Sequence, residues 1–176
     1  MNRLLTLAVV LLVVAPVLAQ DKPPAKAPTV VMTLEKGGQV TLELFPADAP
    51  KHVENFVKLV RAGFYDGQRF HRVEPGFVVQ LGDPQSKTLP MDHSAMGTGG
   101  PGYTIKAEFN NRKFERGILG MARKNEPDTA GSQFYIMLGA APHLNGQYTA
   151  FGRVTSGMDV VDSIKVGDRV KSLKIL

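Results

Sequence analysis

The sequence of 176 residues contains no cysteine and no tryptophan, and aromatic residues make up only 7% of it. Without cysteine the chain forms no disulfide, thiolate nucleophile, iron–sulfur cluster or thiolate-ligated zinc site. Hydrophobic residues at 43% and charged residues at 21% are close to globular averages, so wholesale disorder is excluded. The length suits one folded domain, whose chemistry must proceed without sulfur nucleophiles.

Sequence motifs of metal, hydrolase and nucleotide sites are missing or out of context. The four histidines have no i,i+2 or i,i+4 spacing, so we expect no metal; they are His52, His71, His93 and His143. Ser132 lies in Gly-Ser-Gln and not in the G-x-S-x-G motif of a hydrolase. Residues 97–102 match G-x-G-x-x-G in letters, but Pro101 interrupts them and a strand-like run follows where a helix is required. We therefore expect a flexible glycine-rich loop there, and no cofactor.

A basic protein invites comparison with nucleic-acid-binding proteins. The 21 Lys and Arg against 16 Asp and Glu give a formal net charge of +5. These basic residues are scattered and form no tract of the length that nucleic acid requires. The charge indicates a mildly basic, solvated surface, and we expect no nucleic-acid partner.

Residues 1–19 have the layout of a secretory signal peptide. Arg3 supplies the short positive start, an apolar run follows, and Ala19 offers a small residue for cleavage. The alternative, an uncleaved membrane anchor, would need roughly 20 apolar residues, and this run is shorter and contains Pro16. Residues 20–28 are rich in Pro, Ala and Lys and predict an extended tether. We expect an exported protein, periplasmic or extracellular, without stable membrane association after cleavage.

The remaining residues, 29–176, predict one mainly β domain. Two short β runs, 30–34 and 39–44, flank a Gly-Gly pair and predict a hairpin. A helix is expected from Asp48 or Ala49 to Gly63, with Pro50 in its first turn. Its apolar stripe consists of Val53, Phe56, Val57 and Val60. A second, shorter helix is expected near 157–164.

Six further β runs lie between the two predicted helices. They are 70–73, 77–81, 103–107, 118–123, 133–138 and 150–154. Seven or eight strands with two helices suggest a closed antiparallel barrel whose ends are covered by the helices.

One predicted hairpin, residues 70–84, brings an arginine, a phenylalanine and a glutamine close together. Period-two geometry places Val78 and Gln80 on one face, and likewise Gln133 and Tyr135 in a later strand. Periodicity alone leaves two interpretations open, a functional cleft or an ordinary core with a solvated rim.

The same stretch carries a family resemblance. FHRVEPGFVVQLGDP (70–84) and GILGMARKNEPDTAGSQFYIML (117–138) resemble two signature blocks of the cyclophilin family of peptidyl-prolyl cis–trans isomerases. GGPGYTIKAEFN (99–110) and APHLNGQYTAFGRV (141–154) resemble further blocks in the right order. The similarity runs from about Val30 to the C-terminus. It implies a closed eight-stranded antiparallel β-barrel capped by two α-helices, with a binding groove on its outer face.

The resemblance also implies the site. Arg72 matches the family's catalytic arginine, and ten further residues match substrate-binding positions: Phe77, Val78, Gln80, Met121, Ala122, Arg123, Gln133, Tyr135, His143 and Leu144. Three of them depart from common family residues, namely Tyr135 for phenylalanine, Val78 for methionine and His143 for tryptophan. The segment 85–96 is longer than in compact bacterial members and is assigned no role. The implied partners are proline-containing polypeptides, and we expect a monomer.

The absence of nucleophile, metal and cofactor suits this activity. Rotation of an X–Pro bond makes and breaks no covalent bond, and its barrier is roughly 20 kcal/mol. A thousandfold acceleration requires about 4 kcal/mol, which a desolvated guanidinium and a shaped apolar pocket can supply. The alternative is a module of the same fold that binds proline segments without catalysis. Retention of Arg72 favours the enzyme.

Overall fold

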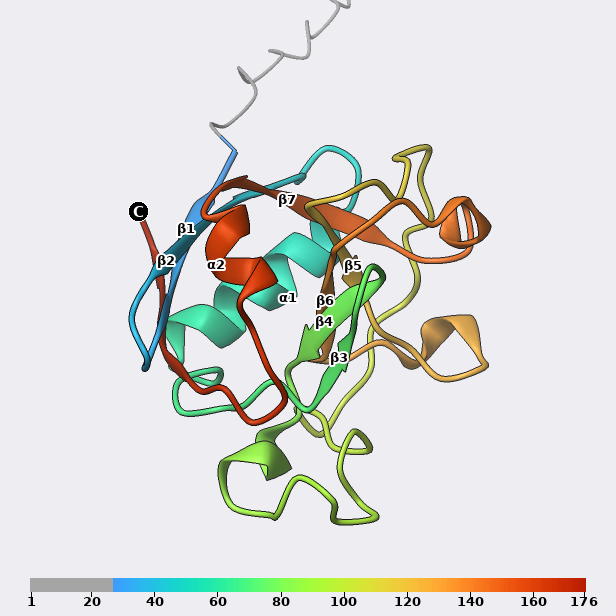
Figure 1. Cartoon of the computed structure of the whole chain (residues 1–176). Coiled ribbons are helices and arrows are strands. Elements are labelled where there is room, and N and C mark those ends of the chain that lie inside the picture. Colours follow the sequence, from blue (N-terminus) through green and yellow to red (C-terminus); the bar gives the residue numbers. More distant parts are fainter. Residues whose placement is uncertain (1–26) are drawn as a thin grey trace, which may run out of the picture.

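Eight antiparallel strands form one curled sheet in the computed structural model, which describes residues 27–176 (Figure 1). Their order across the sheet is β3-β4-β6-β5-β7-β2-β1-β8. The strands are β1 (Thr29–Leu34), β2 (Gln39–Leu44), β3 (Arg72–Glu74), β4 (Val78–Leu81), β5 (Ile118–Met121), β6 (Phe134–Met137), β7 (Ala150–Ser156) and β8 (Val170–Ile175). Three short 3₁₀ turns lie between them: η1 (Pro84–Lys87), η2 (Pro127–Thr129) and η3 (Pro142–Leu144).

The expectation of a closed barrel is wrong, because no ladder joins β3 to β8 within the described residues. Within residues 27–176, an isolated bridge, Arg69 to Arg169, and a few hydrogen bonds of the loops connect the two edges. One of these runs from the Phe70 N–H to the Asp168 carbonyl, at 2.9 Å. β3 has only three residues, which pair with β4. The chain before β3 therefore meets the chain before β8 through loops, and the sheet remains an open, curled half-barrel.

Most of the predicted strands are present, but one predicted run is no strand and the edge strand β8 was missed. The hairpin of β1 and β2 is confirmed, with Val30 opposite Leu42. The run 103–107 is no strand, since only Ile105 forms a bridge, to Ala130. β8 was not expected from the sequence. Its buried residues Val170 and Leu173 are three apart, so it lacks the alternation that predicts a strand.

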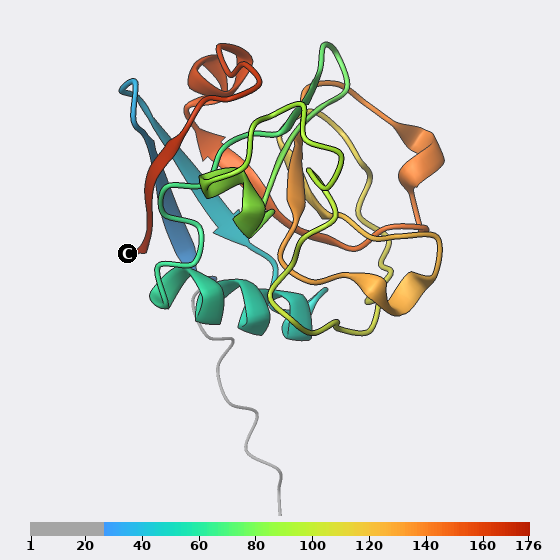
Figure 2. The same ribbon diagram turned by 90° about the horizontal axis from the view of Figure 1, so that it is seen from below.

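Two helices cover opposite ends of the curled sheet, as predicted (Figure 2). α1 (Pro50–Arg61) begins with a proline in its first turn and ends just before Gly63. Its buried face is wider than the predicted stripe, because Leu59, His52 and Asn55 are buried while Val57 is only partly so. α2 (Met158–Asp162) lies within the predicted range 157–164.

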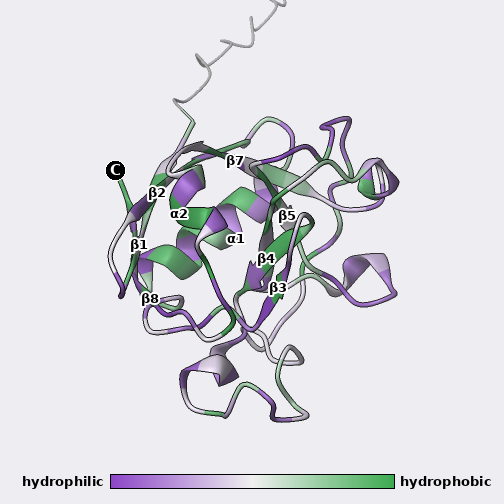
Figure 3. Cartoon of the chain, in the orientation of Figure 1, coloured by the Kyte–Doolittle hydropathy of each residue, from purple (hydrophilic) through white to green (hydrophobic). Residues whose placement is uncertain are grey.

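The sheet has apolar side chains on both faces, and β6 shows this best because all four of its residues are buried. Phe134 and Ile136 point into the main core between the sheet and α1. Tyr135 and Met137 point outward into a second, smaller apolar cluster with Val78. Hydropathy colouring shows apolar residues in β4 and a mixture of apolar and polar residues along α1 (Figure 3). This outer cluster is where a surface groove forms.

The predicted signal peptide, 1–19, lies outside the described residues, as does most of the tether, 20–28. Of the tether, Ala27 and Pro28 are described, and the Pro28 carbonyl accepts a hydrogen bond from the Leu44 N–H at 3.0 Å. Within residues 27–176 no helix has the length and apolar character needed to span a bilayer.

Candidate functional site

A cavity of about 440 Å³ opens on the outer face of the sheet, beside the second apolar cluster. We call it the proline groove; it is lined by Arg72, Phe77, Val78, Gln80, Ala122, Arg123, Tyr135, His143, Leu144, Gln147 and Tyr148. Nine of these are predicted site residues. Gln147 and Tyr148 were missed, although both lie in the block 141–154 that follows the predicted His143 and Leu144.

Strand pairing explains why these side chains converge. Gln80 on β4 lies opposite Arg72 on β3 and opposite Tyr135 on β6. Because side chains alternate along a strand, Val78 and Gln80 share the outer face while the neighbouring Val79 and Leu81 enter the core. The hairpin and β6 together present a cation, an amide and an aromatic ring to one groove.

Two predicted residues lie elsewhere. The Met121 side chain is 1% exposed and points into the main core, because it follows the outward-facing Gly120 by one position on β5. Its side chain therefore does not line the groove. Gln133 lines an adjoining cavity and reaches the groove through a hydrogen bond to Gln80.

The guanidinium of Arg72 is held by three side chains and stays accessible. It donates to Gln80 Oε1 at 3.3 Å and lies 5.7 Å from the centroid of the Phe77 ring. It also pairs with Glu74 Oε1 at 3.7 Å, a contact that the sequence reasoning missed. The i,i+2 spacing on one strand could have revealed it. With side chains 43% and 54% exposed, this ion pair is weak and leaves Arg72 free to bind another group.

The apolar wall is built from rings. The ring centroids of Phe77 and His143 lie 5.9 Å apart. The Tyr135 ring packs between those of Phe114 and Tyr148, with centroid distances of 6.1 and 6.2 Å. Burial raises the pKa of Tyr135 far above its ordinary value, so its hydroxyl is neutral. The Tyr135 Oη has no hydrogen-bond partner within the described structure.

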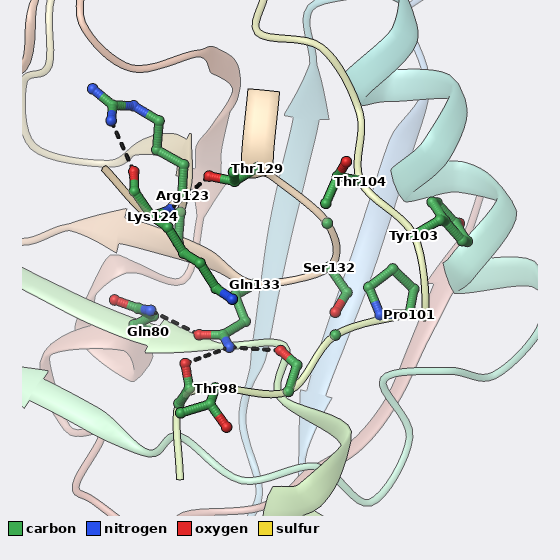
Figure 4. Close-up of a pocket in the computed structure, with 15 residues that line it drawn as sticks. Gln80, Thr98, Pro101, Tyr103, Thr104, Arg123, Lys124, Thr129, Ser132 and Gln133 are labelled. Atoms are coloured by element: carbon green, nitrogen blue, oxygen red, sulfur yellow. Dashed lines mark hydrogen bonds between the residues drawn. The ribbon is translucent and has the colours of Figure 1, made fainter. Parts of the chain in front are cut away.

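A second cavity, of about 200 Å³, adjoins the proline groove (Figure 4). The two cavities share Gln80, Ala122 and Arg123. The Arg123 guanidinium is fixed at this boundary, because it donates to the Gln147 carbonyl at 3.0 Å and packs 4.4 Å from the Tyr148 ring.

The far side of the second cavity is the glycine-rich loop, residues 97–102. We expected this loop to be flexible, but in the structure the side-chain amide of Gln133 holds it through hydrogen bonds. Gln133 Nε2 donates to the carbonyls of Gly97 and Gly99 at 2.9 and 2.8 Å. Gln133 Oε1 in turn accepts from Gln80 Nε2 at 3.0 Å.

Within residues 27–176, no group of three or more His, Asp or Glu is placed to hold a metal ion. His52 is buried, and its Nδ1 lies 2.7 Å from Glu108 Oε2. Burial lowers the pKa of His52 and of His71, so both are neutral at pH 7.

This arrangement can bind an apolar ring beside a hydrogen-bond-donating cation while an extended chain continues into the second cavity. It contains no nucleophile paired with a base among the lining residues. The geometry therefore suits conformational chemistry on a bound peptide.

Comparisons with known proteins agree with this geometry. A family model described as "Cyclophilin type peptidyl-prolyl cis-trans isomerase/CLD" matches residues 29–175. The chain is 50% identical over 147 residues to a probable peptidyl-prolyl cis-trans isomerase of Brucella suis, covering 82% of this chain and 74% of the relative. It is 47% identical over 144 residues to peptidyl-prolyl cis-trans isomerase B of Bacillus subtilis, covering 81% and 94%.

A solved structure is similar as well. The cyclophilin-type isomerase of Cryptosporidium parvum, crystallised in the presence of the dipeptide Ala-Pro, aligns with a TM-score of 0.71 and 30% identity over 84% of this chain and 98% of that one. The chain therefore belongs to the cyclophilin-type peptidyl-prolyl cis–trans isomerase family.

Proposed function

We propose that this isomerase rotates X–Pro peptide bonds in the proline groove, with Arg72 as the catalytic residue, and that it assists the folding of exported proteins as a monomer. The observation that supports this most is the placement of an accessible guanidinium beside an apolar wall within one cavity. Its substrates are polypeptides that contain proline.

The apolar wall binds the proline ring. Phe77, Tyr135 and Leu144 offer carbon surface, and each methylene that they remove from water contributes about 0.8 kcal/mol. Exclusion of water also lowers the local dielectric constant, which strengthens the field of a nearby charge.

Arg72 lowers the barrier by favouring the twisted amide. In the planar amide the prolyl nitrogen shares its lone pair with the carbonyl; in the twisted state the pair is localised and accepts a hydrogen bond. A guanidinium N–H directed at this nitrogen binds the transition state more tightly than the ground state. About 4 kcal/mol of such selective binding accelerates rotation a thousandfold.

The second cavity accommodates the chain next to the proline. Because it shares Gln80, Ala122 and Arg123 with the proline groove, a peptide that fills both must run across this boundary. Fixing the peptide on one side of the X–Pro bond while its ring is held on the other allows the bond to rotate without release.

Exchange spectroscopy by NMR distinguishes the enzyme from the non-catalytic binding module. A peptide containing one Ala-Pro bond shows separate cis and trans signals that interconvert over tens of seconds without a catalyst. We expect cross-peaks between them when the full chain is added at a few per cent of the peptide concentration. Signals that shift on binding yet show no exchange would support the non-catalytic module and contradict the proposal.

The export proposal rests on residues 1–19, with Arg3 before an apolar run and Ala19 at its end. We expect the full-length chain, produced in a bacterium, to leave the cytoplasm and to begin at Gln20. Intact-mass measurement of the protein from each cell fraction checks this. A membrane-bound form that retains Met1 would contradict it.

A further inference from the structure

A buried carboxylate, that of Asp83, binds the backbone of the glycine-rich loop. Asp83 is fully buried at the end of β4, and its carboxylate accepts hydrogen bonds from three backbone N–H groups. These belong to Gln85 at 2.8 Å, Gly97 at 2.6 Å and Gly99 at 3.2 Å. No ion pair to Asp83 forms within residues 27–176. Because a buried charge is costly unless it is hydrogen-bonded, these N–H groups must stay in place.

From the loop, a chain of hydrogen bonds leads to Arg72. The carbonyls of Gly97 and Gly99 accept from Gln133 Nε2, and Gln133 Oε1 accepts from Gln80 Nε2 (Figure 4). Gln80 Oε1 then accepts from the Arg72 guanidinium. Among the described residues, the links between the loop and Arg72 are made by the two glutamine amides.

The direction of every bond in the chain follows from the loop. An amide side chain has one donor end and one acceptor end. Two fixed carbonyls require the Gln133 nitrogen to face the loop, so its oxygen faces Gln80. The nitrogen of Gln80 must then face Gln133, and its oxygen faces Arg72. Rotation of either amide by 180° would place like groups against each other at both ends.

We infer that Asp83 and Gly99 are positioning residues for Arg72: they fix the loop whose carbonyls orient Gln133 and Gln80, and Gln80 in turn orients the guanidinium. This inference rests on the proposed catalytic role of Arg72. It also gives a role to the glycine-rich loop, which the sequence motifs left without one.

The loop contains its own control for this idea. A Cβ added to Gly99 would overlap Asp83 Oδ1 and approach Gln85 Nε2 to 2.6 Å. A Cβ added to the neighbouring Gly100 would meet nothing within 4 Å. Neither glycine has a positive φ, so an alanine is acceptable to the backbone at both positions. The two residues differ in their contact with Asp83.

The test compares Gly99→Ala with Gly100→Ala in the full-length chain. We expect Gly99→Ala to lower kcat about tenfold relative to Gly100→Ala. Both glycines line the second cavity, so a loss shared by the two variants reports the altered lining and appears mainly in KM. In an Arg72→Ala background, Gly99→Ala should change the residual rate by less than about twofold, because two residues acting through one group are not additive. The Arg72 Nε–Hε NMR signal should move in Gly99→Ala and remain in Gly100→Ala.

The kinetic outcomes distinguish a failure of the positioning role from a failure of the proposed catalytic role of Arg72. Equal kinetics for Gly99→Ala and Gly100→Ala, or an equal loss with and without Arg72, would overturn the positioning role. An Arg72→Ala protein with unchanged turnover would instead overturn the proposed catalytic role.

The variant Asp83→Asn provides a second test of the same inference. An asparagine would place an NH₂ group against one of the backbone N–H donors, so we expect the same kinetic pattern with reduced stability. If Asp83→Asn does not fold, the Gly99→Ala result decides.

Discussion

Gly120 and Tyr135 occupy one shared space on the outer face of the sheet. A Cβ added to Gly120 would overlap the Cζ, Cε2 and Oη atoms of Tyr135, which lies opposite it across β5 and β6. An aromatic ring at position 135 therefore depends on a glycine fifteen residues earlier, and the hydroxyl that distinguishes tyrosine from phenylalanine occupies part of the same space. Sequence reasoning identified the unusual tyrosine but could not find its partner, because cross-strand register is not visible in a single strand.

We predict that Gly120→Ala destabilises the protein by about 1–3 kcal/mol through overpacking. It should also displace the Tyr135 ring and raise KM for X–Pro peptides. Urea unfolding measures the first effect. In a Tyr135→Leu background the same Gly120→Ala change should be much less costly, and an equal cost in both backgrounds would show that this contact is not the cause.

At the scale of elements, α1 shows what local sequence does and does not reveal. Pro50 and Gly63 predict where the helix begins and ends, and Ala49 at its N-cap offers no side-chain cap. The missing cap comes from a distant loop: Glu108 accepts hydrogen bonds from the N–H groups of Lys51 and His52 at 3.0 and 2.9 Å. Such a long-range contact has no local signal. The same holds for β8, whose pairing with β1 includes a register shift between Thr33 and Leu34.

Removing this remote cap should weaken the helix. We predict that Glu108→Gln lowers the free energy of unfolding by about 1–2 kcal/mol, since the amide replaces a charged acceptor of several hydrogen bonds. Chemical denaturation checks the value. Glu54→Gln is the matched control on the same helix, because the Glu54 side chain is 71% exposed and its pair with Lys51 contributes little. Equal losses in the two variants would contradict the capping role.

At the scale of the whole molecule, the sequence predicted the mainly β class, the two end helices and most of the groove. It predicted these because strand alternation and family motifs assign each residue to a face. The prediction of a closed barrel was wrong, because closure depends on whether two edge strands far apart in the chain can pair. Here β3 is too short to form that ladder.

Stability of the whole fold should decrease in mild acid. Burial holds the pKa values of His52 and His71 below 6.5, so below that pH the unfolded chain binds protons that the folded chain excludes. Burial alone would raise the pKa of Glu108, but hydrogen bonds from Lys51 and His52 lower it, and its contribution is lost only in stronger acid, below 4.5.

Urea unfolding at pH 7.5 and pH 5.5 measures this change. We expect a lower free energy of unfolding at pH 5.5, and a smaller difference between the two pH values in His52→Gln. His143→Gln, at an exposed position, should keep the full difference. If His52→Gln and His143→Gln behaved alike, the buried histidine would not be the cause.

The most direct test of the account is the kcat/KM of Arg72→Ala on an Ala-Pro peptide in a protease-coupled assay, beside Arg153→Ala. Arg153 is an exposed arginine paired with Glu43 on the sheet and lies outside the residues that line the groove. We predict that Arg72→Ala stays folded and loses at least about 2 kcal/mol of transition-state stabilisation, roughly thirtyfold in rate, while Arg153→Ala keeps its activity. An Arg72→Ala protein that retained more than about half of the unaltered kcat/KM, a loss below about 0.4 kcal/mol, would contradict the proposed mechanism.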